Sequence, residues 1–297
     1  MKLEGILPAL VTPFSEEVNL DEAALERLLD YVYRGGVDGV YICGQTGEGL
    51  QQSPDLRKRV AEAAVRYSPA GKRIVVHVGA PSTHTAVELA RHAAAVGATA
   101  ISSLPPAGAY SFAEIRDYYK ELAAATDLPC LVYHYPAISG TVSSLDQVTA
   151  LCSLPNVIGL KFTDMDLYKL ASLKKAGCNV LNGYDEILVA GLLMGADGGI
   201  GSFYNVAPHL FVELYCAARR GDWARAKAVQ DDINEIITIG LRYPVHSAVK
   251  AMLAWLGLDC GQCLGPRRPL TAVEVRELHE LLERSPLAAA RTTAGRV

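Results

Sequence analysis

The chain has 297 residues, of which 50% are hydrophobic and 20% charged, and its formal net charge is −4. This composition provides for a large core and excludes a mainly disordered chain. Positive and negative side chains are intermixed along the sequence, which excludes the clustered basic surface of a nucleic-acid-binding protein.

The N-terminal residues and the cysteines indicate where the protein works. Residues 1–14 contain the acidic Glu4 and two prolines, and no small-residue cleavage site follows, so we expect neither a signal peptide nor a membrane span. The seven cysteines are scattered and odd in number, which is typical of reduced thiols in the cytoplasm. The CGQC sequence at 260–263 lacks a second pair of zinc ligands, and we interpret it as a loop with two ordinary thiols.

Short apolar runs alternate with longer amphipathic stretches along the first two thirds of the chain. Eight runs predict buried strands, at 5–11, 36–44, 73–80, 100–106, 129–136, 157–162, 179–185 and 198–203. Between them, capping residues predict helices that begin at Asp21, Ser53, Ser82, Ser111, Ser143 or Ser144, Asp166 and Glu186. Eight strands that alternate with helices predict an α/β fold, a closed (β/α)8 TIM barrel. An open doubly wound sheet is the alternative, but its phosphate loop needs a G-x-G-x-x-G spacing that the early GQTGEG segment lacks.

After residue 206 the pattern is helical and shows no further strand. We therefore assign residues 1–225 to the barrel, including its eighth helix. Residues 226–285 are predicted to form a C-terminal helical extension, and residues 286–297 a flexible tail.

One charged residue interrupts the sixth predicted strand, VIGLKF. Alternation along this strand predicts a lumen face with Gly159, Lys161 and Thr163 and an outer face with Ile158, Leu160 and Phe162. An ammonium group without a partner is costly to bury. Burial also lowers the pKa of a lysine, and a neutral amine can form a Schiff base with a ketone. The alternative is that Lys161 extends into a water-filled barrel mouth.

Three further strands end in polar groups that would gather at the same end of the barrel. Tyr133 and Tyr135 share one face of strand five, so a phenol would lie beside the lysine. The GQTGEG turn after strand two offers backbone amides and the Thr46 hydroxyl to an anion, and Asp185 and Glu186 follow strand seven. Ordinary packing, a tight turn and helix capping are the simpler explanations. Together, these groups indicate a site for a polyhydroxylated keto acid.

Four segments together resemble the dihydrodipicolinate synthase and N-acetylneuraminate lyase family: GQTGEG, YHYPAISG, GLKFTD and NGYDEILVAGLLMGADGGIGSFYN. The similarity extends from about Gly5 to Leu282. It implies a class I aldolase that needs neither a metal nor an organic cofactor, forms a homotetramer, and binds pyruvate and a sugar acid. In such an enzyme Lys161 would form the Schiff base, and Tyr133 would take the proton of the C4 hydroxyl.

The motifs fit the lyase branch better than the synthase branch. Synthases usually carry an arginine two residues beyond the strand-five proline, where this chain has Ile138. Lyases have an aliphatic residue there and a GYDE motif, which is present at 183–186. The resemblance implies cleavage of N-acetylneuraminate to pyruvate and N-acetylmannosamine. The alternatives are an aldolase for 2-keto-3-deoxygluconate, a dihydrodipicolinate synthase-like enzyme, and a non-catalytic sensor of pyruvate or sugar acids.

The resemblance also assigns the binding residues. Gln45 and Thr46 would hold the substrate carboxylate. The hydroxyls of the sugar tail would be held by Thr163, Gly183, Asp185, Glu186 and Ser202. Two departures concern the proton relay of the family: Gln45 replaces a serine or threonine, and of a tyrosine pair after strand four only Tyr110 is present, at a shifted position.

Overall fold

The computed structural model describes residues 2–294, in which eight parallel strands form one sheet. Every predicted strand is confirmed within its predicted segment: β1 (Gly5–Pro8), β2 (Gly39–Ile42), β3 (Arg73–His77), β4 (Ala100–Ser103), β5 (Cys130–His134), β6 (Val157–Phe162), β7 (Asn179–Asn182) and β8 (Gly198–Gly201). Consecutive strands pair from β2 to β8, and β8 pairs with β1.

Hydrogen bonds across the seam between β1 and β2 close the sheet. The amide of Leu10 donates to the carbonyl of Tyr41 (2.8 Å), and the amide of Asp38 donates to the carbonyl of Ile6 (3.0 Å). The Asp38 carboxylate accepts a further bond from the amide of Ile6 (2.8 Å). The predicted TIM barrel is therefore confirmed, and the alternative of an open sheet is wrong.

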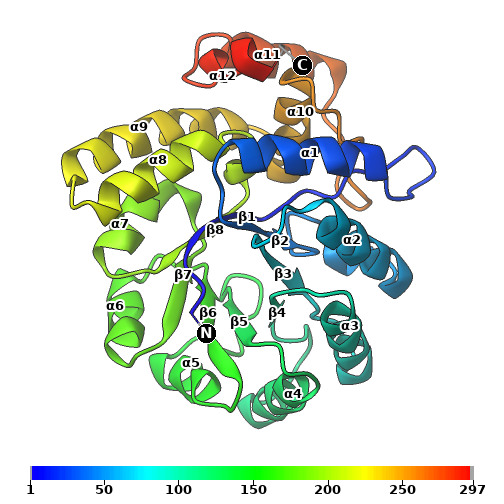
Figure 1. Ribbon diagram of the computed structural model, residues 1–297, viewed down its shortest axis with the longest axis vertical. Helices are drawn as coiled ribbons and strands as arrows, with labels where there is room; N and C mark the ends of the chain where they lie inside the picture. The colour runs from blue at the N-terminus through cyan, green and yellow to red at the C-terminus, as the bar shows by residue number, and fades with distance from the viewer. Residues whose placement is uncertain (1, 295–297) are drawn as a thin grey trace.

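Eight helices surround the strands (Figure 1): α1 (Glu22–Arg34), α2 (Pro54–Tyr67), α3 (Thr83–Ala95), α4 (Phe112–Ala124), α5 (Leu145–Cys152), α6 (Leu167–Lys175), α7 (Leu188–Leu193) and α8 (Pro208–Arg219). The predicted N-caps hold at α1 to α6, and Ser144 rather than Ser143 caps α5. The helix predicted from Glu186 begins differently, because a 3₁₀ turn, η2 (Asp185–Ile187), precedes α7.

Strand residues alternate between two buried clusters. Side chains such as Leu7, Tyr41 and Leu131 fill the barrel lumen, whereas their strand neighbours Ile6 and Val132 pack against the surrounding helices. Because parallel barrel strands are covered on both faces, they read as continuous apolar runs. This is why the strands can be predicted from the sequence.

A bulge in β6 corrects the predicted faces of that strand. The register between β5 and β6 shifts after Val157, so Ile158 packs in the lumen cluster and not on the outer face. Leu160 and Phe162 lie on the outer face as predicted. Gly159 permits the bulge, since a Cβ there would lie 1.9 Å from the carbonyl oxygen of Asn179. Beyond the bulge the alternation resumes and turns Lys161 inward.

Four helices follow the barrel and form the C-terminal extension: α9 (Trp223–Gly240), α10 (Val245–Trp255), α11 (Ala272–Leu282) and α12 (Ala288–Ala294). Where the sequence predicts a flexible tail from 286 onward, the structure instead has α12, with Leu287 fully buried against the extension and Arg291 over the Trp255 ring. Residues 295–297 of the predicted tail lie outside the described residues. Within residues 2–294, no helix is both long and apolar enough to cross a bilayer.

Candidate active site

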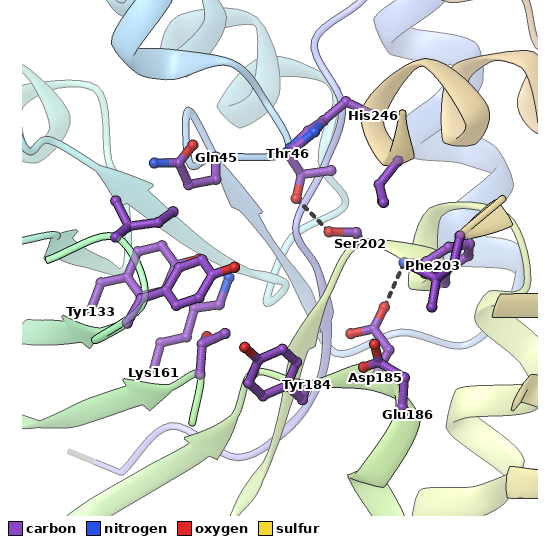
Figure 2. Close-up of a pocket in the computed structure, with 16 residues that line it drawn as sticks. Gln45, Thr46, Tyr133, Lys161, Tyr184, Asp185, Glu186, Ser202, Phe203 and His246 are labelled. Carbon is purple, nitrogen blue, oxygen red and sulfur yellow. Dashed lines mark hydrogen bonds between the residues drawn. The ribbon is translucent and has the colours of Figure 1, made fainter. Parts of the chain in front are cut away.

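A cavity of about 240 Å³ lies at the carboxyl ends of the barrel strands. Nine residues that the sequence predicts for the site line this cavity: Gln45, Thr46, Tyr133, Lys161, Thr163, Gly183, Asp185, Glu186 and Ser202. Figure 2 shows Lys161 beside Tyr133 on one side and Asp185 beside Glu186 on the other, with Tyr184 between them and Thr46 and Ser202 above them in the view. The β6, β2, β5, β7 and β8 ends thus converge as the barrel fold requires.

Lys161 is buried among aromatic rings at the base of this cavity. Its side chain is 4% exposed, and its Nζ lies 4.3 Å from the ring centroid of Tyr133 and 4.9 Å from that of Tyr41. Burial lowers the pKa of Lys161 to about 7, against the opposing negative charge of Asp185. An extended lysine in water would not be buried in this way. At neutral pH a large fraction of Lys161 is therefore the nucleophilic amine.

The lowered pKa of Lys161 predicts a pH profile for imine formation. Because only the neutral amine attacks a ketone, the initial rate with pyruvate should fall about tenfold per unit below pH 7 and level off above pH 8. Trapping with excess cyanoborohydride, read by intact mass, measures this rate. A rate that keeps rising to pH 10 would indicate a lysine of ordinary pKa.

Tyr133 pairs with Lys161 in the β5–β6 register and stacks on Tyr135, with ring centroids 6.0 Å apart. Burial raises the pKa of Tyr133 well above its usual value, and the nearby Thr163 hydroxyl acts in the opposite direction. Gly183 leaves room for that hydroxyl, since a Cβ at Gly183 would lie 2.0 Å from Thr163 Oγ1. The phenol is thus held in its protonated form beside the amine.

In the loop after β2, side chains face the cavity, and two glycines lie where the backbone of the loop or of the segment after β1 comes close. Thr46 Oγ1 lies 2.6 Å from Ser202 Oγ of the β8 loop, so the two hydroxyls share a hydrogen bond. A Cβ at Gly49 would lie 1.8 Å from the carbonyl oxygen of Cys43, and one at Gly47 would lie 2.8 Å from that of Leu10. The tight-turn explanation therefore accounts for these two glycines, whereas Thr46 faces the site.

Asp185 is 5% exposed, and its Oδ2 accepts a hydrogen bond from the amide of Phe203 (2.7 Å) in η3 (Phe203–Asn205). Burial raises the pKa of Asp185 to about 7, although the Phe203 hydrogen bond acts in the opposite direction. The Asp185 carboxylate thus holds the β8 loop in place. The simpler explanation, that it caps the helix it precedes, is not met, because no side-chain cap hydrogen bond is present there. Glu186 lines the cavity next to it.

Seven further lining residues had no binding or catalytic role assigned from the sequence: Tyr135, Ile138, Tyr184, Phe203, Leu241, Val245 and His246. His246 belongs to α10, in an extension that gave no sequence signal of a site. Burial lowers the pKa of His246 to about 4, helped by the positive charges of Arg267 and Lys250.

One predicted residue does not join the site within a single chain. Tyr110 lies in the loop between β4 and α4, is 37% exposed, and is absent from the cavity lining. Its relay role stays a prediction. Across residues 2–294, no three His, Cys, Asp or Glu side chains are grouped as metal ligands.

A model of the dihydrodipicolinate synthetase family matches residues 2–285. The chain belongs to this family. It is 38% identical over 301 residues to an N-acetylneuraminate lyase of Rhizobium meliloti, covering 100% of this chain and 99% of the relative.

Two solved structures extend the family comparison. The CdNal protein of Clostridium difficile, in complex with mannosamine, has a TM-score of 0.92 at 29% identity, covering 96% of this chain and 100% of that one. YagE, a prophage protein of the dihydrodipicolinic acid synthase family from Escherichia coli K12, in complex with pyruvate, has a TM-score of 0.90 at 29% identity, covering 95% and 98%.

Proposed function

We propose that the protein is a pyruvate-dependent carbon–carbon lyase that cleaves N-acetylneuraminate to pyruvate and N-acetylmannosamine. The observation that carries this proposal is the buried amine of Lys161, with its pKa near 7, beside the Tyr133 phenol in a cavity lined by carboxylates. The names of the relatives support it, since they include an N-acetylneuraminate lyase and complexes with pyruvate and with mannosamine.

In the proposed reaction, the Lys161 amine attacks the C2 ketone of the open-chain substrate, and loss of water gives an imine. The protonated imine withdraws electrons as the C3–C4 bond breaks, which leaves the enamine of pyruvate and a free aldehyde. The proton that leaves the C4 hydroxyl is replaced by one on C3: the Tyr133 oxygen accepts the hydroxyl proton as its own phenolic proton passes to C3 of the enamine, so the phenol ends unchanged. Hydrolysis of the pyruvate imine then frees Lys161.

The cavity walls support this choice of substrate. Gln45 and Thr46 would hold the carboxylate next to the imine, and Asp185 and Glu186 would accept hydrogen bonds from the hydroxyls of a long tail. Ile138 lines the cavity where the synthases usually place an arginine for a second carboxylate. The Ile138 side chain cannot pair with a second carboxylate, which supports a lyase over a synthase.

Trapping and turnover together test the proposal. Borohydride reduction with pyruvate should leave one covalent adduct, and turnover should be faster with the nine-carbon N-acetylneuraminate than with the six-carbon 2-keto-3-deoxygluconate. Faster turnover of the six-carbon acid would favour the shorter-chain aldolase. Absence of an imine would favour a sensor that binds sugar acids without chemistry.

We further propose a homotetramer in the cytoplasm, as the resemblance to the family implies. In an assembly, the exposed Tyr110 side chain would be available to the site of a neighbouring copy. Size-exclusion chromatography with light scattering tests the tetramer, and a monomeric mass at assay concentrations would contradict it.

Asp185→Ala tests the tail-binding role of the acidic pair. A hydrogen bond to a charged group contributes ~1.5 to 3 kcal/mol, and each ~1.4 kcal/mol is a decade in rate. We therefore expect kcat/KM for N-acetylneuraminate to fall by roughly one to two decades, while pyruvate trapping at Lys161 hardly changes because pyruvate has no tail.

The control for Asp185→Ala must separate tail binding from the fastening of the β8 loop. Asp185→Asn keeps an oxygen that can accept from the Phe203 amide, so it should retain wild-type thermal stability while still losing activity on the long acid. The quantity to compare is the ratio of activities on nine-carbon and six-carbon acids. An unchanged ratio in folded variants would assign Asp185 a structural role only.

A further inference from the structure

A buried ion pair joins the loop after β2 to the C-terminal extension. Glu48 follows the GQTG turn and is fully buried, and Lys250 of α10 is 3% exposed. Lys250 Nζ lies 3.0 Å from Glu48 Oε1, and the amide of Leu264 donates to Glu48 Oε2 (2.6 Å). Both oxygens of the Glu48 carboxylate are therefore contacted by the extension.

We propose that the Glu48–Lys250 pair positions the Gln45–Thr46 turn to bind the substrate carboxylate, so that the extension is a working part of the active site. This inference rests on the proposed function. Neither residue lines the substrate cavity, and neither touches the reacting atoms. Glu48 and Lys250 are thus positioning residues that act through Gln45 and Thr46.

The backbone of the turn explains why it needs an external restraint. Glu48 adopts a left-handed conformation, with φ of 57°, as does Cys43 before the turn. Residues other than glycine hold this conformation only where the surroundings impose it. The carboxylate contacts from the extension supply that restraint three residues after Gln45.

Burying two opposite charges costs desolvation energy that their attraction only partly returns, so such a pair is weak evidence for stability. Its geometry is nevertheless strict. Lys250 also donates to the carbonyl of Gln262 (2.9 Å) and lies 4.4 Å from the ring centroid of Phe14, which leaves the ammonium one position. A fixed cation in turn fixes the carboxylate of Glu48.

Arg267 of the extension makes a second connection to the same loop. Its Nη1 donates to Gln51 Oε1 (2.9 Å), and its Nη2 lies 3.4 Å from the carbonyl oxygen of Gln45 and 3.5 Å from Gln45 Oε1. A guanidinium only donates hydrogen bonds, so the Gln45 oxygen faces Arg267 and its amide nitrogen faces away. Both ends of the turn, Gln45 and Glu48, are therefore held by the extension.

Lys250→Met tests the proposal by removing the cation. A shift of ~1 Å in a binding group can cost ~10²-fold, so the pyruvate concentration that half-saturates borohydride trapping at Lys161 should rise at least about tenfold. The maximal trapping rate should change less than about threefold, because Lys161 itself is untouched. Lys250→Arg, which keeps the charge, should recover most of the affinity.

Lys174→Met is the control for removing a lysine from an ion pair away from the site, where Asp197 keeps a second cation, because Lys2 Nζ lies 2.8 Å from Asp197 Oδ1. Lys174 Nζ lies 2.6 Å from Asp197 Oδ2, between the end of α6 and the start of β8, at the opposite end of the barrel. Loss of the Lys174 ammonium should lower the melting temperature of the protein without changing the pyruvate concentration that half-saturates trapping at Lys161. Should Lys250→Met not fold, Glu48→Gln keeps an acceptor for the Leu264 amide and should raise half-saturation about three- to tenfold.

Equal half-saturation in wild type and in the folded Lys250 or Glu48 variants would overturn the positioning role while leaving the Schiff base intact. Absence of trapping in the wild-type protein would instead contradict the proposed function itself. The two failures are therefore distinguishable in one experiment.

Discussion

Lys161→Arg is expected to abolish turnover and to prevent any covalent adduct with pyruvate. A guanidinium stays protonated at all working pH values and cannot form an imine. The substitution retains a long side chain against the rings of Tyr41 and Tyr133, but its charge is permanent where that of Lys161 is not. Loss of activity in a folded variant would therefore reflect lost chemistry. Circular dichroism and the melting temperature confirm that the variant folds.

Peptide mapping of the wild-type adduct decides which lysine reacts. Lys250 is the other deeply buried lysine among the described residues, but it is paired with Glu48 and donates to Gln262. The adduct is expected on Lys161 alone. An adduct on Lys250, or full activity in Lys161→Arg, would refute the Schiff-base mechanism proposed here.

Tyr133→Phe is expected to lower turnover by roughly 10² to 10⁴, which is the usual contribution of a positioned proton carrier. The phenylalanine ring preserves the stack on Tyr135 and the edge contact with Tyr41. Only the proton-carrying oxygen is removed. Imine formation with pyruvate should change much less, because no C4 hydroxyl is present in pyruvate.

Tyr135→Phe is the matched control, since Tyr135 stacks on Tyr133 in the same cavity wall. If proton transfer requires a phenol directly beside the Lys161 amine, Tyr135→Phe should retain turnover within about threefold of wild type. Near-normal turnover in Tyr133→Phe would transfer the proton-carrying role to another group, and Tyr110 would be the next residue to substitute.

The barrel could be predicted from the sequence because each strand is buried on both faces and each helix from α1 to α6 begins at a capping residue. The eight strands and six of the helix starts follow from those two signals. The face of Ile158 was mispredicted because a bulge adds one residue to the strand, and simple alternation has no means to detect it. The same bulge left the assignment of Lys161 unaffected, because the alternation restarts after Gly159.

The candidate site was predictable where it lies at strand ends and unpredictable where it depends on the extension. Lys161 stood out as a charge within an apolar run, and Asp185 and Glu186 stood out by their place after a strand. His246 and Lys250 lie on α10, a helix that follows the barrel and therefore carries no strand-end signal. Only tertiary packing brings that helix to the loop after β2.

The long separation between Glu48 and Leu264 also orders events during synthesis. The two residues are 216 positions apart in the chain. At ~5 to 20 residues per second, a ribosome would make Leu264 roughly 10 to 40 s after Glu48. Every strand of the barrel has been synthesised by the end of that interval. The Glu48 carboxylate has no partner from the extension until Lys250 and Leu264 have also been made. The first loop of the site to be synthesised is thus the last to be completed, and a nascent chain cannot hold substrate firmly until its C-terminal helices have emerged and folded.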